Sequence, residues 1–173
     1  MSVRGTDDML APTQILVATD FCEASDAAFA YGREFASRFG ATLHLLHVVE
    51  PLSLKTFGVE PSGALAPLVQ ADLEDAARKQ LDEMLMDSDG SGPPTRRELV
   101  TAVSPAAAIL EYAREEGIDL IVIGTHGRGA LAHLLMGSVA ERVVRLAPCP
   151  VLTVRHPERE FVLPDTLMTV ARA

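Results

Sequence analysis

The stretch LIVIGTHGRGALAHLLMGSVAERVVRLAPCPVLTVR, residues 120–155, decides the fold. It opens on residues 120–123, a short apolar run of the kind that forms a buried strand. Glycines follow this run at four positions, namely Gly124, Gly127, Gly129 and Gly137. Helical spacing then covers 138–146 until Pro148 stops it, and a second apolar run occupies 151–154. The order predicted is strand, glycine-rich loop, helix and strand.

Three more strands are expected before this stretch. They are the runs at 15–18, 42–49 and 97–103, of which the last is the more polar. Segments of helical spacing separate them, so that strands and helices alternate along the chain. Strict alternation with right-handed crossovers builds a parallel sheet with helices on both faces. With 173 residues, the chain has room for one full core and hardly for two, which predicts a single α/β domain.

The intervening helices have recognisable features. The first is marked by apolar or aromatic residues at three- and four-residue steps, namely Ala28, Tyr31, Phe35 and Phe39. Gly40 is expected just past its end. The second runs through 73–85. The third has Ser104 as N-cap, Pro105 in its first turn and Gly117 at its end. The segments 50–67 and 87–95 are rich in turn residues and predict irregular loops.

The composition excludes several classes of protein. Asp and Glu number 24 against 15 Lys and Arg, so the formal net charge is −9. Such a surface repels phosphodiester backbones, and no nucleic-acid partner is expected. Residues 1–14 contain two aspartates and no long apolar core, so no signal peptide is predicted. No apolar run approaches the roughly 20 residues of a membrane span. Cys22 and Cys149 lack CxxC spacing and indicate free thiols of a reducing compartment, for which the cytoplasm fits best.

The glycine-rich loop predicts a phosphate site. Glycines let the backbone approach an anion closely and adopt positive φ, and the helix that follows presents free N–H groups. Ser138 is expected to be the N-cap of that helix, a hydroxyl donor to phosphate, or both, and Arg128 could add a charge-assisted contact. The ATP-type P-loop pattern GxxxxGK[ST] is absent because the loop has no lysine, and no GxGxxG follows the first strand.

The spacing Gly124-x2-Gly127-x9-Gly137-Ser138 resembles the nucleotide-binding signature of universal stress proteins. The segments GTHGRG, LLMGSVAERV and APCPVLTVR are similar to sequences of that family as well. So are ILVATDFCEASDAAFAYG and LHLLHVVEP nearer the N-terminus. The resemblance covers 12–155, which leaves 1–11 as an N-terminal extension and 156–173 as a C-terminal tail. That tail is either disordered or packs its apolar residues against a partner subunit.

The resemblance implies a Rossmann-like open sheet of five parallel strands in the order 3-2-1-4-5, with the ligand where the chain reverses direction. Asp20 and its neighbours would meet ribose and adenine, and the backbone of Val48 the adenine edge. Without the resemblance, Asp20 reads equally well as a turn residue or N-cap. His126 faces either phosphate or solvent. The nucleotide-binding residues predicted are Ala18, Thr19, Asp20, Val48, Gly124, His126, Gly127, Arg128, Gly137, Ser138 and Val139.

The sequence departs from the family pattern at two positions. Ala18 stands where related nucleotide binders often have proline, a change that a backbone contact tolerates. Val103-Ser104-Pro105 replaces the usual Gly-x-Pro, so the Val103 side chain is expected to crowd the loop beside the ligand. Neither departure touches the phosphate signature.

The sequence leaves three functions to compare for this fold. The resemblance favours a stress-response regulatory protein that binds ATP, with Mg²⁺, and at most hydrolyses it slowly. The alternative is a nucleotide-independent, homodimeric interaction protein. An adenine-nucleotide enzyme is disfavoured, because Thr19-Asp20-Phe21-Cys22 replaces the SGGxD-type loop and no HxGH-like words occur. Dimerisation is expected through the edge strand 150–155, as is common in the family.

The histidines do not predict a metal site. His44 and His47 lie three residues apart on a predicted strand and therefore face opposite sides of the sheet. Packing in the core or at the surface is the expected role of both. His126 and His133 have no cysteine or carboxylate at metal-binding spacing.

Overall fold

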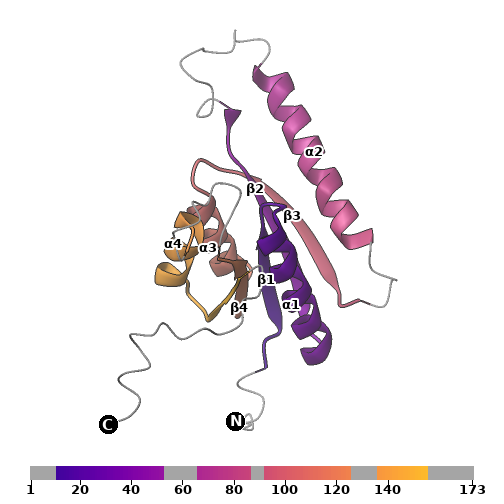
Figure 1. Cartoon of the computed structure of the whole chain (residues 1–173), viewed down its shortest axis with the longest axis vertical. Helices are drawn as coiled ribbons and strands as arrows, with labels where there is room; N and C mark the ends of the chain where they lie inside the picture. The colour runs from indigo at the N-terminus through magenta and orange to yellow at the C-terminus, as the bar shows by residue number, and fades with distance from the viewer. Residues whose placement is uncertain (1–10, 53–65, 87–91, 126–135, 156–173) are drawn as a thin grey trace, which may run out of the picture.

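A computed structural model describes residues 11–52, 66–86, 92–125 and 136–155 (Figure 1). Strands and helices alternate along them in the order β1 (Gln14–Thr19), α1 (Glu23–Phe39), β2 (Thr42–Val49), α2 (Ala66–Met86), β3 (Thr95–Thr101), α3 (Pro105–Glu115), β4 (Leu120–Gly124), α4 (Ser138–Leu146) and β5 (Val151–Val154). The five strands form one parallel sheet in the order β3-β2-β1-β4-β5. This architecture confirms the predicted fold and strand order.

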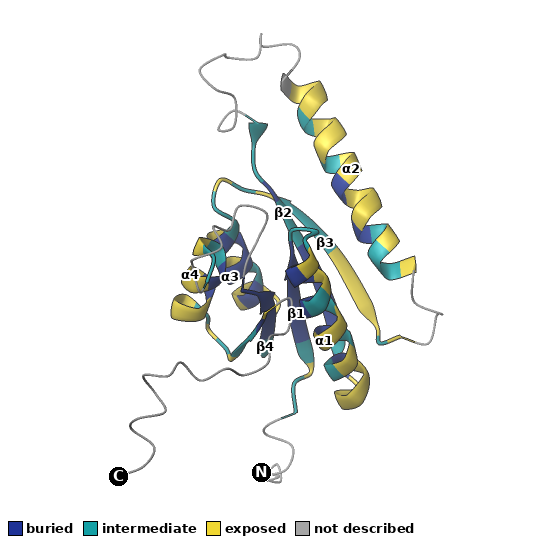
Figure 2. Cartoon of the chain, in the orientation of Figure 1, coloured by how far each residue is buried: buried dark blue, intermediate teal, exposed yellow. Residues whose placement is uncertain are grey.

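The sheet separates two apolar cores. On one face α3 and α4 pack over Leu16, Leu46 and Ile121, whereas α1 and α2 cover the opposite face (Figure 1). Both faces of β1 are covered, and Ile15 and Leu16, which point to opposite faces, are each 0% exposed. Figure 2 shows the central strands as buried, whereas much of the surface of α2 is exposed. A continuous apolar run in β1 is therefore the pattern expected of a strand buried on both sides.

The bounds of two elements differ from the prediction by two residues or more. β3 begins at Thr95 instead of residue 97 and ends before Val103, because its pairing with β2 is extended by backbone bonds at Pro94 and Ala102. α2 begins at Ala66, although the spacing indicated a helix only from residue 73. Pro67 favoured a loop there, but proline is well tolerated in the first turn of a helix.

The predicted stripe of α1 is buried only in part: Ala28 is buried and Phe35 packs against the core, but no aromatic residue of the helix is fully buried. The fully buried residues of α1 are all small, namely Ala24, Ser25, Ala28, Gly32 and Ala36. Tyr31 and Phe39 are 42% and 48% exposed. A Cβ on Gly32 would lie 2.3 Å from Val17 Cγ2, so the small side chains allow α1 to pack closely against the sheet.

Helix ends follow the sequence prediction closely. Gly40 and Gly117 have φ of 67° and 62°, the left-handed conformation that favours glycine after a helix. The Ser104 side chain accepts a hydrogen bond from Ala107 N, as expected of an N-cap. None of the helices in the described ranges is long and apolar enough to cross a membrane.

Candidate functional site

A pocket of about 730 Å³ lies at the carboxyl ends of β1, β2 and β4. The first residues of α3 and α4 and the middle of α2 complete its walls. The chain crosses to opposite faces of the sheet after β1 and β4, and this reversal opens a crevice at the edge where the strands end. The pocket therefore occupies the position at which open α/β sheets bind ligands.

Eight of the predicted nucleotide-binding residues line this one pocket. They are Ala18, Thr19, Asp20, Val48, Gly124, Gly137, Ser138 and Val139. The strands that carry them come from both halves of the chain, and the sheet order brings them together. The other three, His126, Gly127 and Arg128, lie outside the described residues.

The turn after β1 is held by hydrogen bonds between side chains and backbone. Thr19 Oγ1 accepts a bond from Phe21 N at 3.0 Å and donates one to Ser25 Oγ at 3.1 Å. Cys22 N donates to Asp20 Oδ1 at 3.3 Å and to Ser25 Oγ at 3.0 Å. These bonds fix the backbone of the turn and orient the Asp20 carboxylate at the pocket. Burial, followed by the hydrogen bond with Asp20, raises the pKa of the Cys22 thiol.

Gly137, and not Ser138, is the N-cap of α4. Its N–H donates to Thr125 O at 2.6 Å, which ties the start of α4 to the end of β4. Ser138 is instead the first residue of the helix and is exposed, and no side chain caps α4 by a hydrogen bond. Of the two roles considered for Ser138, only that of a hydroxyl donor to a ligand is compatible with this position.

The described glycines of the loop do not use the left-handed conformation. Gly137 has φ −72° and ψ 154°, which is ordinary extended backbone. Gly124 also lacks a positive φ, since only Gly40 and Gly117 among the described glycines have one. A Cβ on Gly124 would lie 2.9 Å from both the carbonyl carbon and the oxygen of Ala24. Gly124 is therefore required by the packing of α1 against β4, whatever the pocket holds.

Sequence reasoning missed the α2 side of the pocket. Leu73, Ala76 and Gln80 of α2 line it, together with Phe21 and His47. Helical periodicity identifies α2, but nothing in the sequence says over which strand a helix lies. For His47 a signal existed, because it precedes Val48 at the carboxyl end of the same strand.

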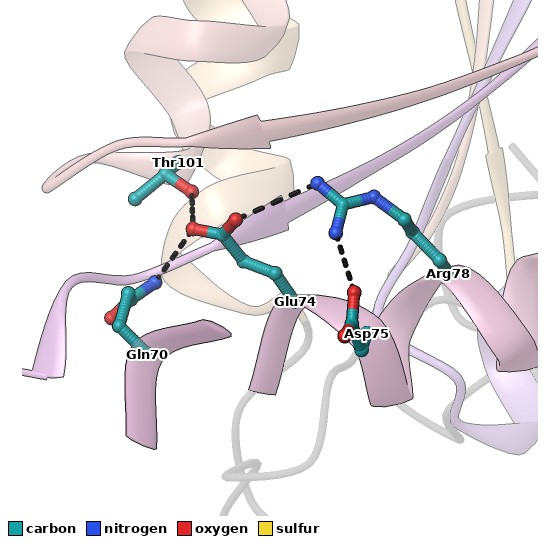
Figure 3. A network of polar contacts seen from close by, with 5 residues as sticks. All are labelled: Gln70, Glu74, Asp75, Arg78 and Thr101. Carbon is teal, nitrogen blue, oxygen red and sulfur yellow. Dashed lines mark hydrogen bonds and ion pairs between the residues drawn. The ribbon is translucent and has the colours of Figure 1, made fainter. Parts of the chain in front are cut away.

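A polar network fastens α2 to the end of β3 (Figure 3). Glu74 Oε1 accepts hydrogen bonds from Thr101 Oγ1 at 2.8 Å and from Gln70 Nε2 at 3.1 Å. Arg78 approaches the other carboxylate oxygen at 3.6 Å, and Gln70 Oε1 accepts a bond from Leu52 N at 3.0 Å. The hydrogen bonds from Gln70 and Thr101 lower the pKa of Glu74. The network ties α2 to the end of β3 through Thr101 and to the segment after β2 through Leu52.

The described lining of the pocket is acidic. It contains the carboxylates of Asp20 and Glu50 and no lysine or arginine. Within this lining, an anion would be attracted by the N-terminus of α4, whose partial positive charge faces the pocket. The described ranges hold no group of three or more His, Cys, Asp or Glu side chains that could bind a metal ion.

The two departures from the family pattern have different outcomes. Ala18 lines the pocket, as predicted. Val103 is 66% exposed and is not among the lining residues, so the expected crowding of the ligand by this side chain is not seen in the described part of the site. Pro105, two residues later, does line the pocket.

The two histidines of β2 face opposite sides of the sheet, as predicted. His44 is 0% exposed and its ring nitrogens lie 2.8 Å from Tyr112 Oη and 2.7 Å from Gln14 Oε1. Burial, together with Arg96, lowers the pKa of His44. His47 lines the pocket, and its Nδ1 donates to the Thr19 carbonyl at 2.8 Å.

Comparison with known proteins identifies the family. The model of the universal stress protein family matches residues 12–155. A universal stress protein from Thermus aquaticus is 37% identical over 141 residues, covering 82% of this chain and 97% of that protein. Universal stress protein MJ0531 from Methanocaldococcus jannaschii is 32% identical over 147 residues, covering 85% and 84%. The chain belongs to the universal stress protein family.

Solved structures agree with the observed architecture. That of MJ0577 from Methanocaldococcus jannaschii has a TM-score of 0.75 at 25% identity, covering 87% of this chain and 100% of the other. Two further structures contain adenine nucleotides: a universal stress protein in complex with cAMP and one from Archaeoglobus fulgidus in complex with dAMP. These two are 23% and 20% identical to this chain, so their likeness is one of fold.

Proposed function

We propose that this chain is a nucleotide-binding regulatory protein that holds ATP, with Mg²⁺, in the pocket at the strand ends. The observation that carries the proposal is the convergence of Asp20, Val48 and the start of α4 on one pocket at the reversal point of the sheet. Proteins of the same fold that hold cAMP and dAMP support the choice of an adenine nucleotide. We infer a stress-response role in the cytoplasm from the family and the free cysteines.

In this proposal each part of the nucleotide has its own protein partner. The phosphates lie against the N-terminus of α4, where backbone N–H groups and the Ser138 hydroxyl act as donors. The ribose lies near Asp20 at the end of β1, and the adenine edge meets the backbone of Val48 at the end of β2. Gly127 and Arg128, with His126, complete the phosphate side as the sequence predicts.

We propose binding rather than efficient catalysis. Enzymes that transfer phosphoryl groups use a lysine on the phosphates and a carboxylate that places Mg²⁺ or the attacking group. The loop at 124–137 has no lysine, and no motif places a general base there. Hydrolysis is therefore expected to be slow at most, and the nucleotide would act as a regulatory ligand.

Homodimerisation through β5 belongs to the same proposal. β5 lies at one edge of the sheet, next to β4, and an open edge offers unpaired backbone groups to a second copy. Val151 and Leu152 on this strand are only half-buried in the single chain. Sedimentation at micromolar concentration is expected to give a dimer, and a monomer would contradict this part of the proposal.

Calorimetric titration of nucleotide-stripped protein with Mg-ATP tests the nucleotide site. Wild-type protein is expected to bind, whereas Gly137→Val is expected to lose binding, because its side chain fills the space in front of the first N–H groups of α4. The extended backbone at Gly137 accepts valine without strain, so the fold should persist. Gly92→Val is the matched control: Gly92 is not a lining residue of the pocket, and among the described residues a Cβ there meets only Arg33 Nε at 3.7 Å. No binding by folded wild-type protein would favour the nucleotide-independent interaction protein.

A further inference from the structure

The pocket opens onto both faces of the sheet. Leu46 and Val48 of β2 pack with the core beneath α3 and α4. His47, between them, points to the opposite face, where its ring meets Phe21 of the turn after β1. All four residues line the same pocket. The family signature concerns the α4 side, and the α2 side has no part in it.

Two aromatic rings form the inner wall on the α2 side. The Phe21 and His47 ring centroids are 4.3 Å apart with an interplanar angle of 37°, so the two rings are in contact and tilted relative to one another. They are the only aromatic side chains in the described lining of the pocket. Leu73 and Ala76 of α2 contribute apolar surface to the same pocket.

The ring pair is fixed before any ligand arrives. His47 Nδ1 donates to the Thr19 carbonyl at 2.8 Å, and Phe21 N donates to Thr19 Oγ1 at 3.0 Å. Phe21 has φ 61°, the single positive φ at a non-glycine residue in the described ranges. A bulky side chain adopts this conformation only where its surroundings impose it, and such strain is concentrated at ligand sites.

The spacing of the strands gives the distance between this aromatic wall and the start of α4, where the phosphates are proposed to bind. β4, β1 and β2 are neighbours in the sheet, so the end of β2 lies two strand spacings, about 10 Å, from the end of β4. The start of α4 is bonded to the residue after β4, and Asp20 follows β1, midway between the two. A nucleotide with its phosphates on α4 and its ribose at β1 would carry its base to the end of β2.

We propose that Phe21 and His47 are the platform on which the base of the nucleotide stacks, with Leu73 and Ala76 of α2 against its other face. The inference rests on the proposed nucleotide function and adds a basis for ligand choice. Aromatic stacking depends on ring area, so the platform favours purine over pyrimidine nucleotides and gives little to a ligand without a base.

Calorimetry with ATP, CTP and ribose 5-triphosphate tests the platform. Wild-type protein is expected to bind ATP most tightly. Phe21→Leu should weaken ATP binding about tenfold, within the range measured for loss of a stacking ring, and leave ribose 5-triphosphate unchanged. Phe21→Tyr, which keeps the ring, should retain the affinity for ATP. Phe39→Leu is the matched control, since Phe39 is 48% exposed at the other end of α1.

The possible results separate the two proposals. If wild-type protein binds ATP but folded Phe21→Leu keeps the same ratio of ATP to ribose 5-triphosphate affinity, the platform is refuted and the nucleotide site stands. If wild-type protein binds none of the three ligands, both proposals are refuted. Should Phe21→Leu fail to fold, nuclear Overhauser contacts between the adenine protons and the Phe21 ring in the wild-type complex decide. Their absence from a saturated complex would overturn the platform.

Discussion

Replacing Gly124 by alanine should destabilise the fold. The cause is a clash inside the protein and not a contact with a ligand. The new Cβ would lie 2.9 Å from the carbonyl carbon and oxygen of Ala24 and 3.2 Å from its Cβ. Backbone atoms cannot rotate away, so either α1 or the end of β4 must shift. Overpacking of a well-packed interior typically costs 1–3 kcal/mol, and we expect Gly124→Ala to lie toward the upper end, at about 2–3 kcal/mol.

Urea unfolding followed by circular dichroism measures this cost, provided that the transition is two-state. Gly92→Ala serves as the matched control, because in the described part of the chain its Cβ would meet only Arg33 Nε, at an ordinary 3.7 Å. We expect the control to change the free energy of unfolding by less than about 0.5 kcal/mol. A Gly124→Ala protein as stable as this control would refute the packing argument and leave ligand contact as the reason for the glycine.

Two further predictions concern Ser138 and His44. Ser138→Ala should weaken ATP binding by about 1–3 kcal/mol, because α4 loses a hydroxyl donor but no cap; unchanged affinity in calorimetry would exclude a phosphate contact. Burial lowers the pKa of His44 in the folded chain, so as the pH falls through the ordinary value of 6.5 the unfolded chain takes up a proton more readily than the folded chain. Stability should therefore fall as pH drops below about 6.5, by at most about 1.4 kcal/mol per pH unit from this residue. His44→Leu should remove that part of the slope in urea titrations between about pH 7.5 and 5, and identical slopes would refute it.

The sequence predicted the sheet because each central strand is buried on both sides. A run such as ILVA at 15–18 is apolar throughout, and this pattern, alternating with helices, is nearly unique to parallel sheets. The polar β3 was harder to delimit, since its residues are exposed or only half-buried and offer no sharp apolar edge. The start of α2 was missed for a related reason, as the first turns carry Leu68 and Val69 on an exposed surface.

The pocket was predictable only in part. Asp20 and Val48 could be placed because the resemblance to universal stress proteins implied both the strand order and the residues at the strand ends. The approach of Phe21 to His47 depends on the positive φ of Phe21 in the turn after β1. The residue types in that turn do not predict this conformation. Glycine, asparagine or aspartate would have signalled such a conformation, whereas phenylalanine signals the opposite.

The signature spacing combines two physical requirements that sequence alone cannot separate. Gly124 is small because the backbone of Ala24 leaves no room for a Cβ. Gly137 has a backbone conformation open to any residue, so its conformation does not require glycine, and we propose that the missing side chain leaves space for a ligand in front of α4. Gly124→Ala should therefore lower mainly the free energy of unfolding, whereas Gly137→Val should lower mainly the affinity for ATP. If the two variants differ in this way, Gly124 is needed for the stability of the fold and Gly137 for binding of the ligand.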